Sequence, residues 1–313
     1  MTVPGSRTGA TLAAESLTAG YGSRAVIKDV SLGVSGGKVL AIVGLNGAGK
    51  TTLLRVLAGL KSPMSGRVLI NGADVYQRTT SSDVALVLQN IAIDRQLSGR
   101  EYLEFAGRAR GFSKASARSS VSEVIDELDL GAFADRRGGQ LSGGQARRLQ
   151  LGGSLVRRPR VLLLDEPTTG LDPSARRGYW AVIRQLASNG LTLVMVTHHI
   201  DEANLADEVL VLADGRVVSS GHPRDLVGQS SLSVVEFDFN RTGDAEAVYQ
   251  HLGSEAADRT DAVVSVTTTN PAEVLSTVEK LRPDQDFEVR MRPAALDDLL
   301  VHLAKQGAGR IDG

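Results

Sequence analysis

Residues 44 to 52 have the pattern of a loop that binds a phosphate chain. They read Gly-Leu-Asn-Gly-Ala-Gly-Lys-Thr-Thr and lie between apolar runs at 39–43 and 53–57. This order predicts a buried strand, a glycine turn and a helix start, where unpaired backbone amides and the helix dipole attract phosphate. We expect Lys50 to reach the outer phosphates and the Thr51 hydroxyl to bind Mg²⁺. The alternative for this pattern alone is a glycine-rich turn that binds nothing.

Polar side chains also follow three other apolar runs of strand length. They are Gln89, the adjacent pair Asp165 and Glu166, and His198. In an α/β sheet the carboxyl ends of the strands face the ligand crevice. Asp165 there could hold Mg²⁺ through water, and Glu166 could polarise a water for attack on a terminal phosphate. His198 could bond that phosphate, and Gln89 could sense Mg²⁺ or the attacking water, although each of these two taken alone is more simply a structural residue.

A second helix start with anion-binding features lies at 141–145, which reads Leu-Ser-Gly-Gly-Gln. Serine is a good N-cap and the adjacent glycines expose backbone amides, so a second anion site is predicted there. A plain capped helix is the alternative. Arg147 and Arg148, together with the arginines at 157–160, are interpreted as solvated faces of this helix and its end. Tyr21, upstream of the phosphate loop, could stack on a purine or could simply pack at a strand end.

The elements that must position these residues alternate between strands and helices. A helical insertion is expected within 98–130, a hairpin is expected across Ala213-Asp214-Gly215, and Asp172 before Pro173 is read as an N-cap. Gly152-Gly153 lies inside the helix that follows 141–145, where two glycines cost on the order of 1 kcal/mol each relative to alanine. Nothing in the sequence explains this pair.

Composition narrows the class of protein. The chain has 313 residues, 42% of them hydrophobic, which indicates a globular protein of about two domains. Lysine plus arginine (35) nearly balances aspartate plus glutamate (36), so no global field favours nucleic acid or an anionic membrane. The absence of cysteine excludes disulfides, thiolate metal sites and thiol nucleophiles. Neither a secretory signal nor a membrane span is expected, so any membrane role must come through a partner.

The predicted organisation has four parts: a flexible start at 1–9, a main domain at 10–228 with a helical subdomain at about 95–158, a small α+β domain at 229–306, and a flexible tail at 307–313. The small domain has no recognisable catalytic constellation, which favours interaction or regulation.

Within the small domain, alternation predicts strands around 235–239, 263–266 and 287–291. Proline positions predict helices over 271–282 and 294–304.

The ordered set of Tyr21, the phosphate loop, Gln89, the LSGGQ segment, LLLDEP at 162–167, GLD at 170–172 and His198 resembles the nucleotide-binding subunit of ABC transporters over about residues 10–228. The resemblance implies an α/β fold of the P-loop NTPase class, with a helical subdomain and a small C-terminal α+β domain. It implies an ATP hydrolase with ATP and Mg²⁺ as ligands. Glu166 would be the general base, with His198 and Lys50 as the other catalytic residues.

The resemblance also implies roles for the remaining residues. Tyr21 would stack on adenine, and Thr51, Gln89 and Asp165 would hold Mg²⁺. The implied nucleotide-binding set is Tyr21, Gly44, Asn46, Gly47, Ala48, Gly49, Lys50, Thr51, Thr52, Gln89, Ser142, Gly143, Gly144 and Gln145.

Ser142, Gly143 and Gly144 would contact the ATP held by an opposite subunit. One nucleotide cannot use two separate helix starts of one monomer, so a head-to-tail homodimer or heterodimer that shares two ATP accounts for both sites. The further partner would be an integral membrane permease on a separate chain, with this protein at the cytoplasmic face of the membrane. No nucleic-acid partner is expected.

The segments at 168–173, 100–103 and 296–303 look like the daunorubicin-resistance branch of ABC-2 exporters. This looser similarity implies export of a small molecule such as a drug, an antibiotic or a lipid-like compound. The alternative is an ABC-type ATPase acting on nucleic acid or ribosomes, but such proteins usually carry two ATPase units or a long coiled coil, and this chain has one unit. A non-hydrolysing nucleotide sensor is disfavoured by the intact Lys50, Asp165, Glu166 and His198.

Overall fold

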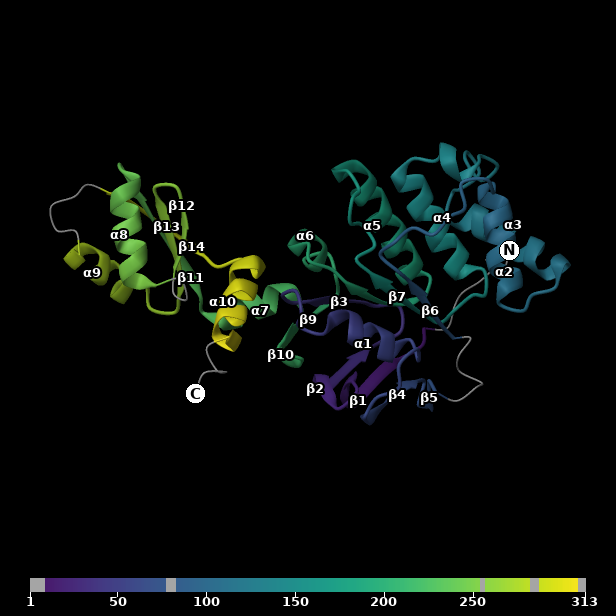
Figure 1. Cartoon of the computed structure of the whole chain (residues 1–313), viewed down its shortest axis with the longest axis horizontal. Coiled ribbons are helices and arrows are strands. Elements are labelled where there is room, and N and C mark those ends of the chain that lie inside the picture. Colours follow the sequence, from purple (N-terminus) through teal and green to yellow (C-terminus); the bar gives the residue numbers. More distant parts are fainter. Residues whose placement is uncertain (1–8, 77–82, 254–256, 282–286, 309–313) are drawn as a thin grey trace. The chain divides into compact units, whose positions relative to one another are not determined.

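The structure is a computed structural model that describes residues 9–76, 83–253, 257–281 and 287–308. The predicted flexible start and tail fall largely outside the described residues. The chain divides into two compact units, Met1–Val217 and Val218–Gly313 (Figure 1). The domain limits given above, including the boundary at 228, stay predictions.

The first unit contains an antiparallel sheet with the strand order β2-β1-β4-β5. Residue Leu12 of β1 faces Val34 of β2 on one side and Ile70 of β4 on the other. These strands are β1 (Leu12–Tyr21), β2 (Arg24–Val34), β4 (Ser65–Ile70) and β5 (Ala73–Asp74).

A larger sheet has the order β10-β9-β3-β8-β7-β6, of which β3 and β6 to β9 belong to the first unit, and its neighbours from β9 to β6 are parallel. Every residue of β3, β7 and β8 is buried, as expected for parallel strands covered on both faces. The carboxyl ends of these strands therefore meet at one edge. The strands are β3 (Val39–Val43), β6 (Val84–Val87), β7 (Val161–Asp165), β8 (Thr192–Val196), β9 (Glu208–Ala213) and β10 (Arg216–Gly221). The expected hairpin across 213–215 is confirmed as β9 and β10.

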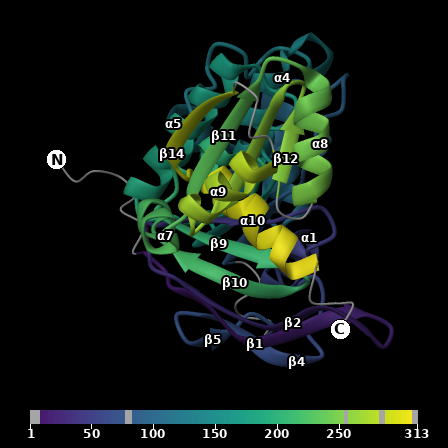
Figure 2. The same ribbon diagram turned by 90° about the vertical axis from the view of Figure 1, so that its left-hand side faces the viewer.

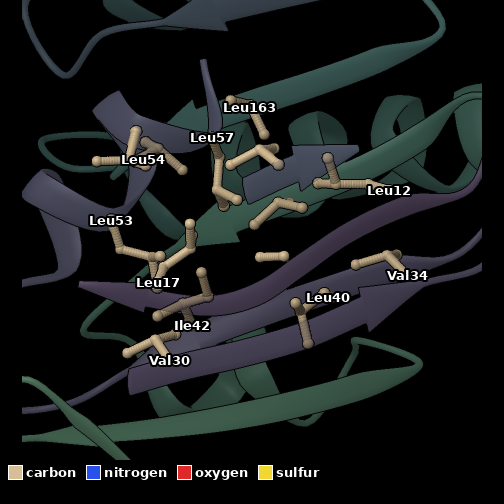
Figure 3. Close-up of a cluster of buried hydrophobic side chains, with 14 of the residues drawn as sticks. Leu12, Leu17, Val30, Val34, Leu40, Ile42, Leu53, Leu54, Leu57 and Leu163 are labelled. Atoms are coloured by element: carbon tan, nitrogen blue, oxygen red, sulfur yellow. The ribbon is translucent and has the colours of Figure 1, made fainter. Parts of the chain in front are cut away.

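The core between the two sheets holds helix α1 (Lys50–Leu57) in place (Figure 3). Leu53, Leu54 and Leu57 of this helix are at most 1% exposed. They belong to one apolar cluster with Leu17 of β1 and Leu163 of β7. This packing fixes the start of α1 at the strand-end edge of the parallel sheet.

The helical part of the unit follows β6. It contains α2 (Gly99–Ala109), α3 (Lys114–Glu127), a 3-10 turn at Gly138–Gln140 and α4 (Gly143–Leu155), and the chain later adds α5 (Pro173–Ser188) and α6 (Ile200–Ala203). The expected helical insertion is confirmed as α2 and α3.

The Gly152-Gly153 pair lies where α4 packs against its neighbours. A Cβ at Gly152 would come within 3.1 to 3.3 Å of the side chains of Leu103, Val124 and Leu130. A Cβ at Gly153 would come within 3.0 to 3.3 Å of the Tyr102 ring. Close contact of α4 with α2 and α3 therefore explains both glycines.

The second unit contains a sheet of order β12-β13-β11-β14, with α8 and α9 packed on one face. Val235, Phe237 and Phe239 of β11 form the core with Val248 of α8 and Val278 of α9. Its elements are α7 (Pro223–Ser230), β11 (Ser233–Phe239), α8 (Thr242–Leu252), β12 (Ala257–Thr260), β13 (Val263–Thr268), α9 (Pro271–Leu281), β14 (Phe287–Pro293) and α10 (Leu296–Ala308). Sequence reasoning predicted three of these strands and helices α9 and α10, and it missed α7, α8 and β12.

Candidate functional site

The strand order brings the predicted strand-end residues together. Along the edge of the parallel sheet, the phosphate loop follows β3, His198 follows β8, Asp165 and Glu166 lie at the end of β7, and Gln89 follows β6. Residues from four distant parts of the chain therefore share one edge.

The phosphate loop has the backbone geometry that its glycines allow. Gly44 has a φ of 155° and an added Cβ would lie 2.1 Å from the Leu212 carbonyl oxygen; Gly49, the N-cap of α1, has a φ of 101°. Side chains disfavour both positions. The loop can therefore keep its backbone amides open to a ligand.

Lys50 is held by its own loop. Its side chain is 7% exposed, and Nζ donates to the carbonyl oxygens of Gly44 at 2.7 Å and Leu45 at 2.9 Å. Burial lowers the pKa of Lys50, and the carboxylates of Glu166 and Asp165 oppose that shift. A poorly hydrated ammonium bonded only to neutral carbonyls is well suited to bind an anion.

Glu166 contacts two of the other strand-end residues, Gln89 and His198. It has a φ of 43°, directly after the end of β7. Its Oε2 accepts hydrogen bonds from Gln89 Nε2 at 2.8 Å and from Thr169 Oγ1 at 3.2 Å, and it lies 3.3 Å from His198 Nδ1. The structure thus brings two predicted residues, Gln89 and His198, to one carboxylate oxygen of a third, Glu166. Thr169 is an additional partner that the sequence did not single out.

The residues predicted to hold Mg²⁺ offer suitable donors. Asp165 is 9% exposed, and its burial, followed by the charge of Glu166, raises the pKa of its carboxyl group. The charges of Arg55 and Lys50 oppose this shift but do not cancel it. Thr51 is exposed at the start of α1, so hydroxyl, carboxylate and amide oxygens are available from Thr51, Asp165 and Gln89. The described residues contain no group of three His, Cys, Asp or Glu side chains that could hold a metal ion. Because Mg²⁺ is commonly bound by one or two carboxylates plus substrate phosphates, this donor set fits.

Tyr21 lies at the end of β1 and is 53% exposed. Its hydroxyl accepts a hydrogen bond from Arg55 Nη1 at 3.1 Å, and Lys61 Nζ lies 4.1 Å from the ring centroid. The ring is therefore accessible rather than packed into the core.

The LSGGQ segment forms a capped helix start apart from the residues just described. Ser142 caps α4: its Oγ accepts from Gln145 N at 3.3 Å, and Gln145 Oε1 accepts from Ser142 N at 3.1 Å. In the described ranges, no hydrogen bond or ion pair joins residues 142–145 to the phosphate loop or to the strand-end residues. Ser142, Gly144 and Gln145 instead line a recess of about 600 Å³ that also includes Asp172.

Arg147 corrects the interpretation of the arginines as solvated: it is 1% exposed. Its guanidinium donates to the backbone carbonyls of Leu88 at 3.1 Å and Glu166 at 3.0 Å, and to that of Pro167. It also donates to Gln150 Oε1 at 2.6 Å. Burial lowers the pKa of Arg147. One residue of the helix after LSGGQ is thus bonded to the segments that carry Gln89 and Glu166.

Two other buried polar residues support the same segments. Gln150 Nε2 donates to the carbonyls of Leu88 at 3.2 Å and Asn90 at 2.8 Å. Glu202, 1% exposed, accepts from Thr197 Oγ1 at 2.5 Å and from Thr168 Oγ1. Sequence reasoning missed Arg147, Gln150 and Glu202. The sequence held one signal for Arg147 and Gln150. Positions 150 and 151 follow 147 by three and four residues, so the three side chains lie on one face of the helix.

Comparison with known proteins decides the family. Residues 27–169 match the ABC transporter family. The chain is 35% identical over 292 residues to the daunorubicin resistance ATP-binding protein DrrA3 of Streptomyces coeruleorubidus, which covers 90% of this chain and 92% of that protein. The chain belongs to the ABC transporter ATP-binding family. It is therefore an ATP-binding subunit and an ATP hydrolase, and its fold is the P-loop NTPase fold predicted above.

One further relative and one solved structure match only the larger part of this chain. The Fe(3+) ions import ATP-binding protein FbpC of Brucella melitensis is 39% identical over 215 residues, which covers 68% of this chain and 61% of that protein. A solved structure titled as the dimeric structure of MJ0796, a bacterial ABC transporter cassette, has a TM-score of 0.59 and 26% identity, and covers 67% of this chain and 98% of that chain. Across the part of this ABC subunit that the structure describes, no helix is long and apolar enough to cross a membrane.

Proposed function

We propose that this chain is the nucleotide-binding subunit of an exporter. ATP hydrolysis by a dimer of such subunits would drive a small molecule, such as a drug, an antibiotic or a lipid-like compound, through a separate permease. The chain would lie at the cytoplasmic face of the membrane and reach the bilayer through that permease. The main support is the match to the daunorubicin resistance protein, which covers 90% of this chain, whereas the iron import match covers 68%.

The phosphate loop and Lys50 bind the phosphates in this proposal. The amides at the start of α1 and the ammonium of Lys50 supply positive charge, and ligand phosphate oxygens replace the Gly44 and Leu45 carbonyls around Nζ. Adenine stacks on Tyr21, whose exposed ring has Arg55 and Lys61 beside it. Thr51, Gln89 and Asp165 would hold Mg²⁺, which would neutralise charge on the phosphates.

Glu166 acts as the general base. Water oxygen bonds to the terminal phosphorus while the bond to the bridging oxygen of ADP breaks, and the water proton passes to the Glu166 carboxylate. Gln89, Thr169 and His198 all lie within 3.3 Å of Oε2 and orient that carboxylate. His198, 45% exposed, is free to contact the terminal phosphate once ATP is bound.

Dimerisation completes the site. The LSGGQ segment makes no described bond to the phosphate loop of its own chain, so we assign Ser142, Gly143, Gly144 and Gln145 to the ATP of the opposite subunit. The pair can be two copies of this chain or one copy with a relative. An ATPase acting on nucleic acid or ribosomes is the disfavoured alternative, since the transporter relatives span most of the chain.

The test uses a tagged Glu166→Gln protein in its own host, because removal of the base should hold the ATP-bridged dimer. Membranes are solubilised with ATP and Mg²⁺ present, and copurifying proteins are identified. Lys50→Ala, which should not hold the dimer closed, is the matched control. Recovery of a multi-span protein in comparable amount would support the exporter proposal. Recovery of ribosomes, nucleic acid or nothing would overturn it.

A further inference from the structure

Strand β14 ends the sheet of the second unit, with β11 as its neighbour in the described residues (Figure 2). Its residues 288 to 293 are all exposed. An edge strand of this length presents unpaired backbone groups that can pair with another strand.

The direction of those groups follows from two backbone hydrogen bonds. Ala294 N donates to Leu232 O at 3.1 Å on the β14 side, and Phe239 N donates to Ala262 O at 3.0 Å on the β13 side. Because backbone groups alternate between the two sides of an antiparallel strand, even-numbered residues of β14 face β11. The N–H and C=O groups of Phe287, Val289 and Met291 therefore point away from the sheet. Pro293 has no N–H, so it ends the series of donors.

The side chains on this edge continue the apolar face of the sheet. Val289 lies directly opposite Phe237 and Met291 opposite Val235, so these side chains share the face that packs against α8 and α9. Phe237 and Val235 are fully buried, but Val289 is 41% and Met291 60% exposed. The apolar face thus extends beyond the part that the helices cover.

We propose that β14 pairs antiparallel with β14 of a second copy of this chain, with the two-fold axis at Val289. In this register Phe287 lies opposite Met291 of the second copy, which joins apolar side chains on the core face. Glu288 lies opposite Arg290 on the other face, twice per dimer. Within one chain Glu288 Oε2 and Arg290 Nη2 are already 3.2 Å apart, so the pairing forms a network of four charges.

The sequence of β14 selects this register over its neighbours. Outward-facing groups require odd residues to lie opposite odd residues, which places the axis at a residue rather than between two residues. Within Phe287–Pro293, axes at 289, 290 and 291 give the longest overlaps. An axis at Arg290 sets Glu288 opposite Arg292, but it places Arg290 opposite itself and Phe287 opposite Pro293, which has no N–H to donate. An axis at Met291 places Arg290 opposite Arg292. Like charges directly opposite are unfavourable in a sheet, so the strand is complementary to itself about Val289.

This contact differs from the ATP-bridged dimer, because it uses no residue of the phosphate loop or the LSGGQ segment. It goes beyond the proposed function, and it predicts association that persists without nucleotide.

The test uses cysteine cross-linking of the full chain, which has no native cysteine. A Val289→Cys protein places the two sulfurs at the axis, where opposed Cα atoms are about 5.5 Å apart and a disulfide can form. Oxidation of the purified protein in EDTA without nucleotide should convert most of it to a covalent dimer. Thr260→Cys on β12, the opposite edge, is the control and should stay monomeric. Equal cross-linking of both proteins, or none of V289C, would overturn the proposal.

Charge reversal then tests the register in the Val289→Cys background. Addition of Glu288→Arg or of Arg290→Glu places like charges opposite each other, and each protein alone should cross-link at least fivefold less. A mixture of the two differently sized proteins should give the heterodimer in near-parental yield, because opposite charges face each other again. Mixing cannot repair damage within one chain. Failure of the mixture to cross-link would refute the register and with it the proposed pairing.

Discussion

The buried Arg147 gives the sharpest test of how the site is built. An Arg147→Met substitution keeps most of the side-chain volume and removes the guanidinium. The carbonyl of Pro167 and Oε1 of Gln150 then lose their donor. The carbonyl of Glu166 keeps a bond from Thr169 N, and that of Leu88 keeps its bond from Gln150 Nε2. A buried acceptor left without a partner costs about 1–3 kcal/mol. The substitution also removes a buried charge and with it the penalty of desolvating that charge. We therefore expect a net decrease of about 2–4 kcal/mol in the free energy of unfolding.

Trp180 allows a specific measurement. It is the single tryptophan of the chain, lies in α5 and is 4% exposed, so its fluorescence reports unfolding of the first unit. Urea titration should show a lower midpoint for R147M with an unchanged slope. Arg118→Met is the matched control: Arg118 is 61% exposed, 3.5 Å from Glu104, and its loss should change stability by at most about 0.5 kcal/mol.

Catalysis should fall together with stability, because Arg147 holds the backbone next to Gln89 and at Glu166. Under folded conditions we expect kcat for ATP to drop by about tenfold or more, with a smaller change in KM, since the phosphate loop is untouched. Arg147→Lys should recover part of both losses, because an ammonium can still donate to these carbonyls. A Met variant with parental kcat, and with stability within about 0.5 kcal/mol of the parent, would refute this reasoning.

Three further substitutions test the rest of the site and its support. Glu166→Gln should lower kcat by about 10²–10⁴-fold with ATP binding retained, measured by equilibrium binding and phosphate release, and parental turnover would remove Glu166 as the base. Asp165→Asn should raise the unfolding midpoint of the nucleotide-free protein. Burial and the charge of Glu166 raise the pKa of Asp165, so the folded protein favours the protonated carboxyl. The stabilising contribution of Asp165 is complete below about pH 3.9 and is lost as pH rises through the raised pKa. The stability advantage of the Asn variant should therefore grow with pH in urea titrations. Gly152→Ala should destabilise by about 1 kcal/mol, because overpacking against Leu103, Val124 and Leu130 exceeds the helix-propensity gain; a more stable variant would contradict the packing argument.

Local features of the site could be predicted from the sequence. The strand, glycine turn and helix start at 39–57, Ser142 as an N-cap and Asp172 as N-cap before Pro173 all occur as expected. Each depends on residues a few positions apart, where backbone geometry and local hydrogen bonds follow directly from residue type. The apolar runs that end in polar residues likewise predicted strands β3, β6, β7 and β8.

The tertiary structure alone decided which distant segments meet. The order β3-β8-β7-β6 differs from the chain order and places His198 and Gln89 around Glu166. Arg147 looked like a surface residue because residue type predicts exposure only on average, whereas the surrounding carbonyls fix its burial. The reason for Gly152-Gly153, the apolar edge of β14 and the missed α8 have the same origin. They depend on contacts between elements far apart in the chain, and the spacing of residues along one segment does not specify such contacts.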